Sequence, residues 1–434
     1  MSLRDALNSA RASHDFVVIE KPVSKHLQIS GALKKLEPSP VLFTQVEGSD
    51  FDVVGNLFCQ KKVIAEYFGI PVEQIIPKMV NAIGQREPCK RVEKAACQEV
   101  IDLHPNLDQL PILRHCEQDG GAYISAGVVV AKHSKWGQNL DFHRLMQFSS
   151  TELAVRVVRN RHFDAFLRDL GEVEVAVCIG AGPNVLLAAA TSVERGVDEL
   201  EIANALEPLS VVKAKTVDLW VPAECEFVLE GKVYLSQTHA EGPFVDLTET
   251  YDVVREEPVL VVQAITHRKN AIWQALLPGG LEHKLLMGMP REPTIFKKVN
   301  EVVRCLDVYI NPGGCSWLHA IVKIHKKHED DGRKAIAAAF EGHKSCKHVF
   351  VVDDDIDIYN PLEVEWATAT RFQADRDLVI IGREPGSSLD PSSDPGSHLT
   401  AKVGFDLTKP LQTHGKSFNR AKFPDVDLTA LMEK

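Results

Sequence analysis

The chain has 434 residues, of which 49 are Lys or Arg and 60 are Asp or Glu, so its formal net charge is −11. This length exceeds one ordinary hydrophobic core, and two or three domains are therefore expected. The negative charge disfavours a general binder of phosphate backbones, so we expect no nucleic-acid partner and only a local anion site.

Cysteine usage and hydropathy indicate a cytoplasmic protein. The nine cysteines are scattered and include no Cys-x-x-Cys pair. This pattern favours free, mostly buried thiols over a disulfide framework or a structural zinc site. The N-terminus lacks the long apolar core of a signal peptide, and the one long apolar run, 175–193, is interrupted by Gly180, Gly182 and Pro183. We therefore expect no membrane segment.

Residues 1–115 mix helical and strand patterns, and we expect them to form an N-terminal α/β domain. Hydrophobic periodicity predicts helices over 3–12 and 61–68 and strands over 16–19 and 41–43. The proline-containing segment 105–111 is interpreted as a linker.

Residues 116–305 carry mostly strand patterns, which predict a barrel-like sheet with an inserted helix over 199–206. The expected strands cover 123–130, 153–158, 173–177, 217–221 and 259–262. Within the long apolar run we expect a strand, a turn and a helix that begins near Pro183. Gly180-Ala181-Gly182 is similar to part of a dinucleotide fingerprint, but the third glycine is absent, so a plain turn is favoured.

Residues 306–434 return to an α/β pattern and are expected to form a C-terminal domain with an oligomerisation tail. An Ala-rich segment predicts a helix over 333–340, and apolar runs predict strands over 348–352 and 378–381. The composition of 386–396, rich in Ser, Pro and Gly, indicates a loop or a disordered tether.

Two features of this last part suggest other kinds of enzyme. The acids Asp353-Asp354-Asp355 follow a buried strand, as in metal-dependent nucleotide-sugar transferases. No phosphate-binding Gly-rich loop accompanies them, so a solvated, helix-capping strand end is favoured. Cys315 and His319 would lie one turn apart on a helix, but no third group is evident that would orient a thiol nucleophile.

The segment 239–246 places two carboxylates, Glu241 and Asp246, on either side of Gly242-Pro243. Gly and Pro favour a tight reversal in which both acids face one point. Two close carboxylates tend to separate their pKa values, so that one can hold a proton near neutrality. The alternative is a surface loop with two solvated acids, and the residues upstream favour proton-transfer chemistry.

Upstream and downstream of this turn, the order of residues resembles the UbiD family of prenylated-flavin-dependent decarboxylases. The motifs that carry the resemblance are 139–144, His162, Glu199, 221–231, 266–269, 312–316, 351–355 and 367–372. One of these motifs alone is weak evidence for the resemblance, whereas all of them in the order of the family are strong evidence. The resemblance implies a split β-barrel between two α/β domains and a homo-oligomer, either a dimer or a hexamer. It also implies a small carboxylic acid as substrate and a flavin prenyltransferase that supplies the cofactor.

Asn139, His162 and Glu199 supply an amide oxygen, an imidazole and a carboxylate, a set suited to Mn²⁺ or Mg²⁺. The resemblance implies that this ion holds the phosphate of prenylated FMN, with Lys326 on the same phosphate. Taken singly, His162 would be a structural histidine and Lys326 a solvated one among basic neighbours.

The wall of the cofactor site follows from the resemblance as well. Trp136, Phe142, His143 and Arg161 match positions that contact the flavin, and the family places K⁺ or Na⁺ near this wall.

Arg144 lies five residues after Asn139, on an element connected to the predicted metal ligand. The resemblance implies a catalytic triad of Arg144, Glu241 and Asp246, in which the guanidinium pairs with Glu241 and orients the substrate carboxylate. Loss of CO₂ from an unactivated sp² carbon requires an electron sink that no side chain supplies. Asp246 is then implied to protonate the carbon. A flavin-binding subunit without activity is the non-enzymatic alternative, which the intact triad disfavours.

His283 and Arg291 lie eight residues apart and offer two donors for a second anionic group of the substrate. The alternative is two surface residues. The resemblance favours members that convert furan-2,5-dicarboxylate to 2-furoate, and Leu389 matches a loop residue that packs over the flavin. trans-Anhydromevalonate 5-phosphate, whose phosphate also requires basic donors, and a phenolic acid such as 4-hydroxybenzoate are the alternative substrates.

Overall fold

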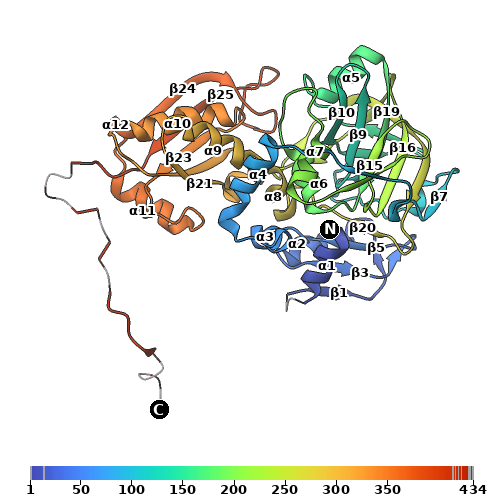
Figure 1. The fold of residues 1–434 in the computed structure, drawn as a ribbon, viewed down its shortest axis with the longest axis horizontal. Coiled ribbons are helices and arrows are strands. Elements are labelled where there is room, and N and C mark those ends of the chain that lie inside the picture. Colours follow the sequence, from blue (N-terminus) through green and yellow to red (C-terminus); the bar gives the residue numbers. More distant parts are fainter. Residues whose placement is uncertain are drawn as a thin grey trace.

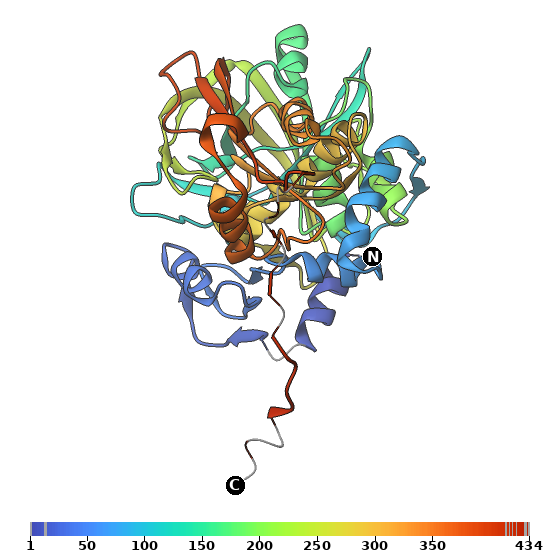
Figure 2. The same ribbon diagram turned by 90° about the vertical axis from the view of Figure 1, so that its left-hand side faces the viewer.

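The computed structural model describes residues 2–12, 15–412, 415, 417–418, 420–421, 423–428 and 432. The chain forms three parts, and Figure 1 shows the N-terminal part below the central sheet and the C-terminal part beside it. Seen from the side in Figure 2, the first helices lie under the central sheet. Among the helices of the described residues, none is long and apolar enough to cross a membrane.

The N-terminal part combines a small mixed sheet with four helices. Its strands follow the order β1 (Val17–Ile19), β3 (Val41–Phe43), β5 (Asp52–Gly55) and β20 (Ile272–Gln274). The helices are α1 (Leu3–Arg11), α2 (Gln28–Leu36), α3 (Lys61–Phe68) and α4 (Ile75–Gly84), and β2 (Val23–Ser24) pairs with β4 (Val46–Glu47). The helices and strands predicted here are confirmed to within one residue.

The central part is a curled antiparallel sheet, which confirms the predicted split barrel. Its strands follow the order β10 (Gly137–Phe142), β9 (Val128–His133), β13 (Glu172–Ile179), β16 (Phe227–Glu241), β19 (Arg255–His267), β12 (Glu152–Val155), β11 (Leu145–Gln147) and β8 (Ala122–Ile124), and β7 (Val100–Asp102) pairs with β19. Two register shifts bend β16 against β19. At the first of them, a side chain on Gly231 would collide with the Val261 carbonyl oxygen.

Helices and a small sheet complete this part. The helices are α5 (His162–Leu170), α6 (Pro183–Ala190) and α7 (Glu199–Leu206), and the small sheet follows the order β15 (Trp220–Pro222), β14 (Ser210–Lys213) and β6 (Lys90–Val92). The predicted turn at Gly180, the helix from Pro183 and the helix over 199–206 are confirmed.

Four predicted strands of the central part are wrong in extent. The strand predicted over 153–158 already ends at Val155, and the one predicted over 259–262 is the middle of the longer β19. The segment 123–130 is two strands, because β8 and β9 lie toward opposite ends of the curled sheet and the chain must cross between them. The segment 217–221 becomes a strand only at Trp220. Ahead of it, the buried Glu230 carboxylate accepts hydrogen bonds from the Lys215 and Thr216 amides at 2.9 and 2.5 Å and holds the chain in a turn.

The C-terminal part is a five-stranded sheet with helices. Its strands follow the order β21 (Cys305–Ile310), β22 (His319–Ile324), β23 (His348–Val352), β25 (Leu399–Asp406) and β24 (Leu378–Pro385). The helices are α10 (Asp331–Gly342), α11 (Pro361–Arg371) and α12 (Ala374–Asp377), while α8 (Leu281–Gly288) and α9 (Glu292–Asn300) connect the sheet to the barrel. Short 3₁₀ helices are η1 (Val72–Gln74), η2 (Ala96–Gln98), η3 (Leu107–Gln109), η4 (Met289–Arg291) and η5 (Pro312–Gly314).

Two expectations for this part are wrong. Cys315 ends η5 with a φ of +61° and His319 opens β22, so the two residues do not share a helix. The solvated strand end is wrong for Asp353, which is buried and accepts a hydrogen bond from the buried Arg371 at 3.1 Å, whereas Asp354 and Asp355 are exposed as expected. Asp355 also pairs with Arg371 and Lys409, so two of the acids that the transferase alternative would use for a metal have cationic partners.

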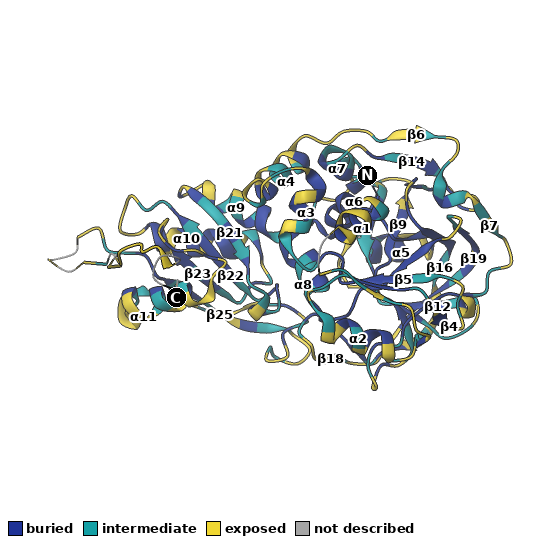
Figure 3. Cartoon of the chain, turned by 90° about the horizontal axis from the view of Figure 1, so that it is seen from below, coloured by how far each residue is buried: buried dark blue, intermediate teal, exposed yellow. Residues whose placement is uncertain are grey.

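Two clusters of buried apolar side chains each span the N-terminal and central parts, whereas the C-terminal part has a core of its own. Figure 3 shows that the strands of the central sheet are largely buried. All nine cysteines are free thiols, five of them buried, as predicted. In Figures 1 and 2 the described residues 423–428 lie away from the three parts, and Phe423 is 91% exposed. The predicted oligomerisation tail includes 413–414, 416, 419, 422, 429–431 and 433–434, which lie outside the described residues.

Candidate active site

A cavity of about 500 Å³ lies between the central sheet and the C-terminal part. It is lined by β10, the start of α5, the ends of α6 and α8, and the loop that follows β24. Most residues predicted for the site line it together: Asn139, Phe142, His143, Arg144, Arg161, His162, Glu199, Asp246, His283, Arg291 and Leu389. Side chains as much as 250 positions apart in the sequence therefore share one cavity.

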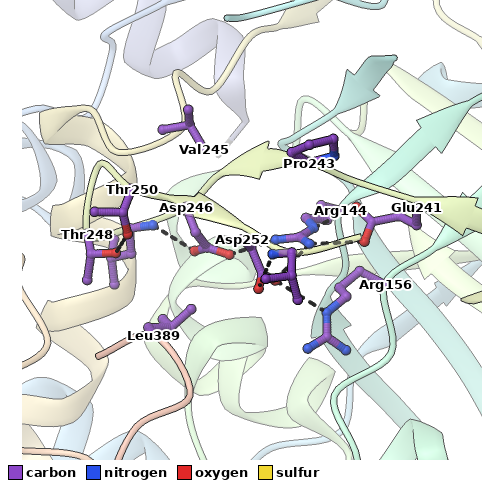
Figure 4. Close-up of polar contacts among 12 residues, drawn as sticks. Arg144, Arg156, Glu241, Pro243, Val245, Asp246, Thr248, Thr250, Asp252 and Leu389 are labelled. Carbon is purple, nitrogen blue, oxygen red and sulfur yellow. Dashed lines mark hydrogen bonds and ion pairs between the residues drawn. The ribbon is translucent and has the colours of Figure 1, made fainter. Parts of the chain in front are cut away.

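Arg144 binds the two other predicted catalytic residues, Glu241 and Asp246 (Figure 4). Its Nε and Nη2 donate to the two oxygens of Glu241 at 2.8 and 3.0 Å, and its Nη1 donates to Asp246 at 2.8 Å. Burial lowers the pKa of Arg144, but the hydrogen bonds and charges of its carboxylate partners outweigh burial and raise that pKa above its usual value. The guanidinium is therefore permanently charged, and the Phe244 ring covers it at 4.9 Å.

The chain places the two acids by a turn and a hairpin. Strand β16 ends at Glu241, and Gly242 adopts a φ of +102°, a conformation that glycine tolerates best. A hairpin of β17 (Phe244–Val245) and β18 (Tyr251–Asp252) follows. Asp246 lies in its loop, where its amide donates to the Thr250 carbonyl at 3.0 Å. The Gly-Pro turn thus brings both acids to one guanidinium, although they do not contact each other directly.

Glu241 and Asp246 differ in their access to the cavity. Glu241 is fully buried, with both oxygens bound to Arg144. Asp246 keeps 19% of its side chain exposed and lines the cavity. Of the two acids, Asp246 is therefore the one that can meet a bound molecule.

Sequence reasoning missed Asp252, the third carboxylate on Arg144. Its Oδ2 accepts from Arg144 Nη2 at 2.9 Å and from Arg255 Nη1 at 2.7 Å. Burial raises the pKa of Asp252, but its hydrogen bond with Arg255 and the charge of Arg144 reverse this effect and lower it to about 2. No sequence pattern indicated Asp252; the hairpin places it opposite Phe244, beside Arg144.

The predicted metal ligands lie on one wall of the cavity. His162 Nδ1 is 2.9 Å from Asn139 Oδ1, and a Glu199 oxygen accepts from the Leu140 amide at 2.8 Å. The Asn139 amide nitrogen is buried without a hydrogen-bond partner. Burial strongly raises the pKa of Glu199. A buried carboxylate, an amide and an imidazole fit a divalent cation, which would stabilise the charged form of Glu199.

Among the described residues, no three His, Cys, Asp or Glu side chains group into a metal site. The predicted set contains an asparagine, so it lies outside that finding and stays a prediction.

Two predicted cofactor residues lie off the cavity. Trp136 stacks on His133 at 4.1 Å, with the Arg195 guanidinium 4.5 Å from its ring. Lys326 donates to the Thr408 hydroxyl at 2.9 Å and to the Lys409 carbonyl at 3.0 Å. Neither residue lines the cavity. In this arrangement Lys326 binds the residues that follow β25 and forms an ion pair with Glu329 at 3.2 Å. Its contact with the flavin phosphate stays a prediction.

Three arginines line the cavity without a carboxylate partner. Within the described residues, Arg159, Arg161 and Arg291 form no ion pair with an acid. Arg291 donates to the Ala190 carbonyl at 2.9 Å and to the Ser192 hydroxyl, while its Nε is buried without a partner. Burial, followed by the charge of Arg161, lowers the pKa of Arg291 to about 10. Arg161 and Arg291, which act on each other, define a local anion site, as the acidic composition required.

His283 is the second predicted donor for the substrate. It lines the cavity, and its Nδ1 accepts a hydrogen bond from the Gly279 amide at 3.1 Å. Burial lowers the pKa of His283, so the imidazole is neutral near pH 7. It contributes a hydrogen bond but no charge to the anion site.

This fold and this site define a class of enzyme: carboxy-lyases with an Arg-Glu-Asp cluster on a curled sheet between two α/β domains. Sequence profiles of 3-octaprenyl-4-hydroxybenzoate carboxy-lyase match this chain with the N-terminal domain at 7–83, the Rift-related domain at 90–281 and the C-terminal domain at 284–407. The chain belongs to the UbiD family of decarboxylases.

Relatives and solved structures cover almost the whole chain. An anhydromevalonate phosphate decarboxylase of Methanocaldococcus jannaschii is 42% identical, over 94% of this chain and 97% of its own. The protein of the same name from Methanosarcina mazei is 40% identical, over 98% and 100%. The UbiD-class enzyme HmfF of Pelotomaculum thermopropionicum, solved in complex with FMN, is 35% identical with a TM-score of 0.95, and the match covers both chains completely.

Proposed function

We propose that this protein decarboxylates trans-anhydromevalonate 5-phosphate with prenylated FMN as its cofactor. The observation that carries the proposal is the pair of uncompensated guanidiniums, Arg161 and Arg291, in the cavity that also contains Arg144. A phosphate monoester carries a charge of about −1.5 to −2 at neutral pH. Two free cations match such a group better than they match the single charge of a remote carboxylate.

The relatives support the same substrate. Proteins named anhydromevalonate phosphate decarboxylase are 34–42% identical to this chain over 94–98% of its length. The cofactor proposal is supported by the HmfF structures, which are described in complex with FMN and with prFMN. A flavin prenyltransferase would supply this cofactor, and we expect a homo-oligomer.

Arg144, Glu241 and Asp246 would each have a separate role in the reaction. Arg144 receives and orients the substrate carboxylate, and Glu241 holds Arg144 in place from the buried side. When bound, prenylated FMN supplies the electron sink for the electrons left by CO₂. The carbon that carried CO₂ then needs one proton, and Asp246 delivers it, because Asp246 faces the cavity and Glu241 does not.

The predicted ligands would hold the cofactor at the opposite wall. Asn139, His162 and Glu199 would bind Mn²⁺ or Mg²⁺, which in turn would bind the flavin phosphate. His143 lies next to this wall, with its ring fixed between the Asp141 carboxylate and the Arg156 carbonyl at 2.9 and 2.8 Å.

A second substrate has one observation in its favour. His283 and Arg291 line the same cavity, as the interpretation in terms of furan-2,5-dicarboxylate requires. The neutral imidazole and the guanidinium would together bind one remote carboxylate, and the product would be 2-furoate.

A substrate panel decides between the two. The protein is produced together with a flavin prenyltransferase, and release of CO₂ is measured with trans-anhydromevalonate 5-phosphate, furan-2,5-dicarboxylate and 4-hydroxybenzoate. We expect turnover of the phosphorylated acid. Turnover of the furan diacid alone would replace the proposal by the second substrate, and turnover of 4-hydroxybenzoate alone would refute both.

A further inference from the structure

Asp252 has no role in the reaction described so far, although it binds the central arginine. Its side chain is 14% exposed and lines the cavity. One oxygen lies between three guanidiniums, at 2.9 Å from Arg144 Nη2, 2.7 Å from Arg255 Nη1 and 3.8 Å from Arg156 Nε. The other oxygen accepts from the Val253 amide at 2.9 Å. Figure 4 shows the carboxylate beside Arg144, on the hairpin that also carries Asp246.

The donors of Arg144 are almost completely used. A guanidinium has five N–H groups. The Nε–H and one Nη2–H donate to Glu241, the second Nη2–H donates to Asp252, and one Nη1–H donates to Asp246. One N–H remains free, and it is on Nη1, the same nitrogen that binds Asp246.

We propose that Asp252 is a positioning residue of the decarboxylation site, which blocks Nη2 of Arg144 and directs the substrate carboxylate to Nη1, next to Asp246. A carboxylate that accepts the free N–H of Nη1 shares this nitrogen with Asp246. Binding therefore places the reacting carbon beside the proton donor. This inference holds for any acid that the enzyme accepts, so it does not depend on the substrate proposed above.

The charges of the cluster support this role. It contains three guanidiniums and four carboxyl groups, one more acid than base. One proton therefore makes the cluster neutral. Ten charged or titratable side chains surround Asp252: Arg144, Arg156, Arg255, Glu241, Asp246, Glu257, Asp119, His283, Lys284 and Tyr123. Asp252 stays ionised among its three arginines, and the acid beside it that faces the cavity is Asp246.

Asp252→Asn tests the proposal with the holoenzyme and whichever acid of the panel wild type decarboxylates. The amide removes the charge and opens Nη2 to the substrate, so we expect kcat to fall about 10- to 100-fold while KM stays the same or decreases. Loss of a nearby negative charge lowers the pKa of the proton-bearing acid. The high-pH limb of the kcat profile should therefore move to lower pH by about one pH unit.

Three further variants keep the test decisive. Asp252→Glu keeps the charge and should retain the wild-type high-pH limb. Arg255→Gln removes a positive charge beside Asp252 and should move the high-pH limb to higher pH. This variant replaces Asp252→Asn in the test if Asp252→Asn does not fold. Asp218→Asn controls for the loss of a negative charge alone, because Asp218 is an exposed acid that pairs with Lys132 and Lys213. It should change neither kcat nor the position of the high-pH limb. A folded Asp252→Asn with wild-type kcat, or with reduced kcat and an unmoved pH limb, would overturn the proposal.

Discussion

Replacement of Arg291 by alanine tests the substrate proposal most directly. Arg291 is the uncompensated guanidinium that lies close to Arg161 in the cavity, so its removal takes one of the two proposed partners from a bound phosphate. Loss of one charge-assisted hydrogen bond in a partly dry site costs about 2 to 3 kcal/mol. This corresponds to about 30- to 150-fold in kcat/KM, at about 1.4 kcal/mol per tenfold.

The assay compares two substrates and two enzymes. kcat/KM is measured for trans-anhydromevalonate 5-phosphate and for the same acid without its phosphate, with wild type and with Arg291→Ala. We expect the full loss only for the phosphorylated acid, because the other acid never used the guanidinium. Arg168→Ala is the matched control, since this exposed arginine pairs with Asp164 on α5 and does not line the cavity. An equal loss of kcat/KM with both acids would refute the assignment of Arg291 to the phosphate. It would show that Arg291 maintains the structure of the site and does not bind the phosphate.

Four other substitutions have defined outcomes. Glu241→Gln and Asp246→Asn should each reduce kcat at least about 100-fold without loss of bound flavin, and wild-type turnover in either variant would contradict the assigned roles. Glu199→Ala should purify with little flavin and little divalent metal, measured by absorbance and elemental analysis; a full complement of both would show that the ligand set is wrong. Arg371→Ala leaves the buried Asp353 carboxylate unpaired and should lower the free energy of unfolding by about 3 to 5 kcal/mol in denaturant titrations, whereas Arg383→Ala, whose exposed arginine pairs with Asp394, should change it by less than about 1 kcal/mol.

The pH dependence of stability gives one more check. The pKa of Asp252 is lowered from 3.8 to about 2, so its charged form stabilises the fold fully above pH 3.8. This contribution is lost as the pH falls toward 2. Asp252→Asn should therefore show a smaller loss of unfolding free energy over this interval than wild type, and identical curves would show that Asp252 is not held in its charged form.

The short-range features of this chain could be predicted from its sequence. Helices such as α3 and α7 and the strand β23 have the bounds that periodicity gave them, because apolar spacing and caps act within a few residues. The Gly-Pro turn placed Glu241 and Asp246 correctly for the same local reason. The order of the motifs identified the family, since the motifs occur along most of the chain.

The contacts between distant segments could be seen only in the tertiary structure. Asp252 lies 108 residues from Arg144, and no local pattern indicates that the hairpin brings the two together. Lys326 faces Thr408, and not the cavity, because the C-terminal sheet sets its direction. The strand predicted over 123–130 breaks where the sheet curls, since closure of a sheet depends on all of its strands at once. The sequence determined which groups are present and the local turns that carry them, whereas the hydrogen bonds that charge and orient those groups depend on side chains that only the folded sheet brings within reach.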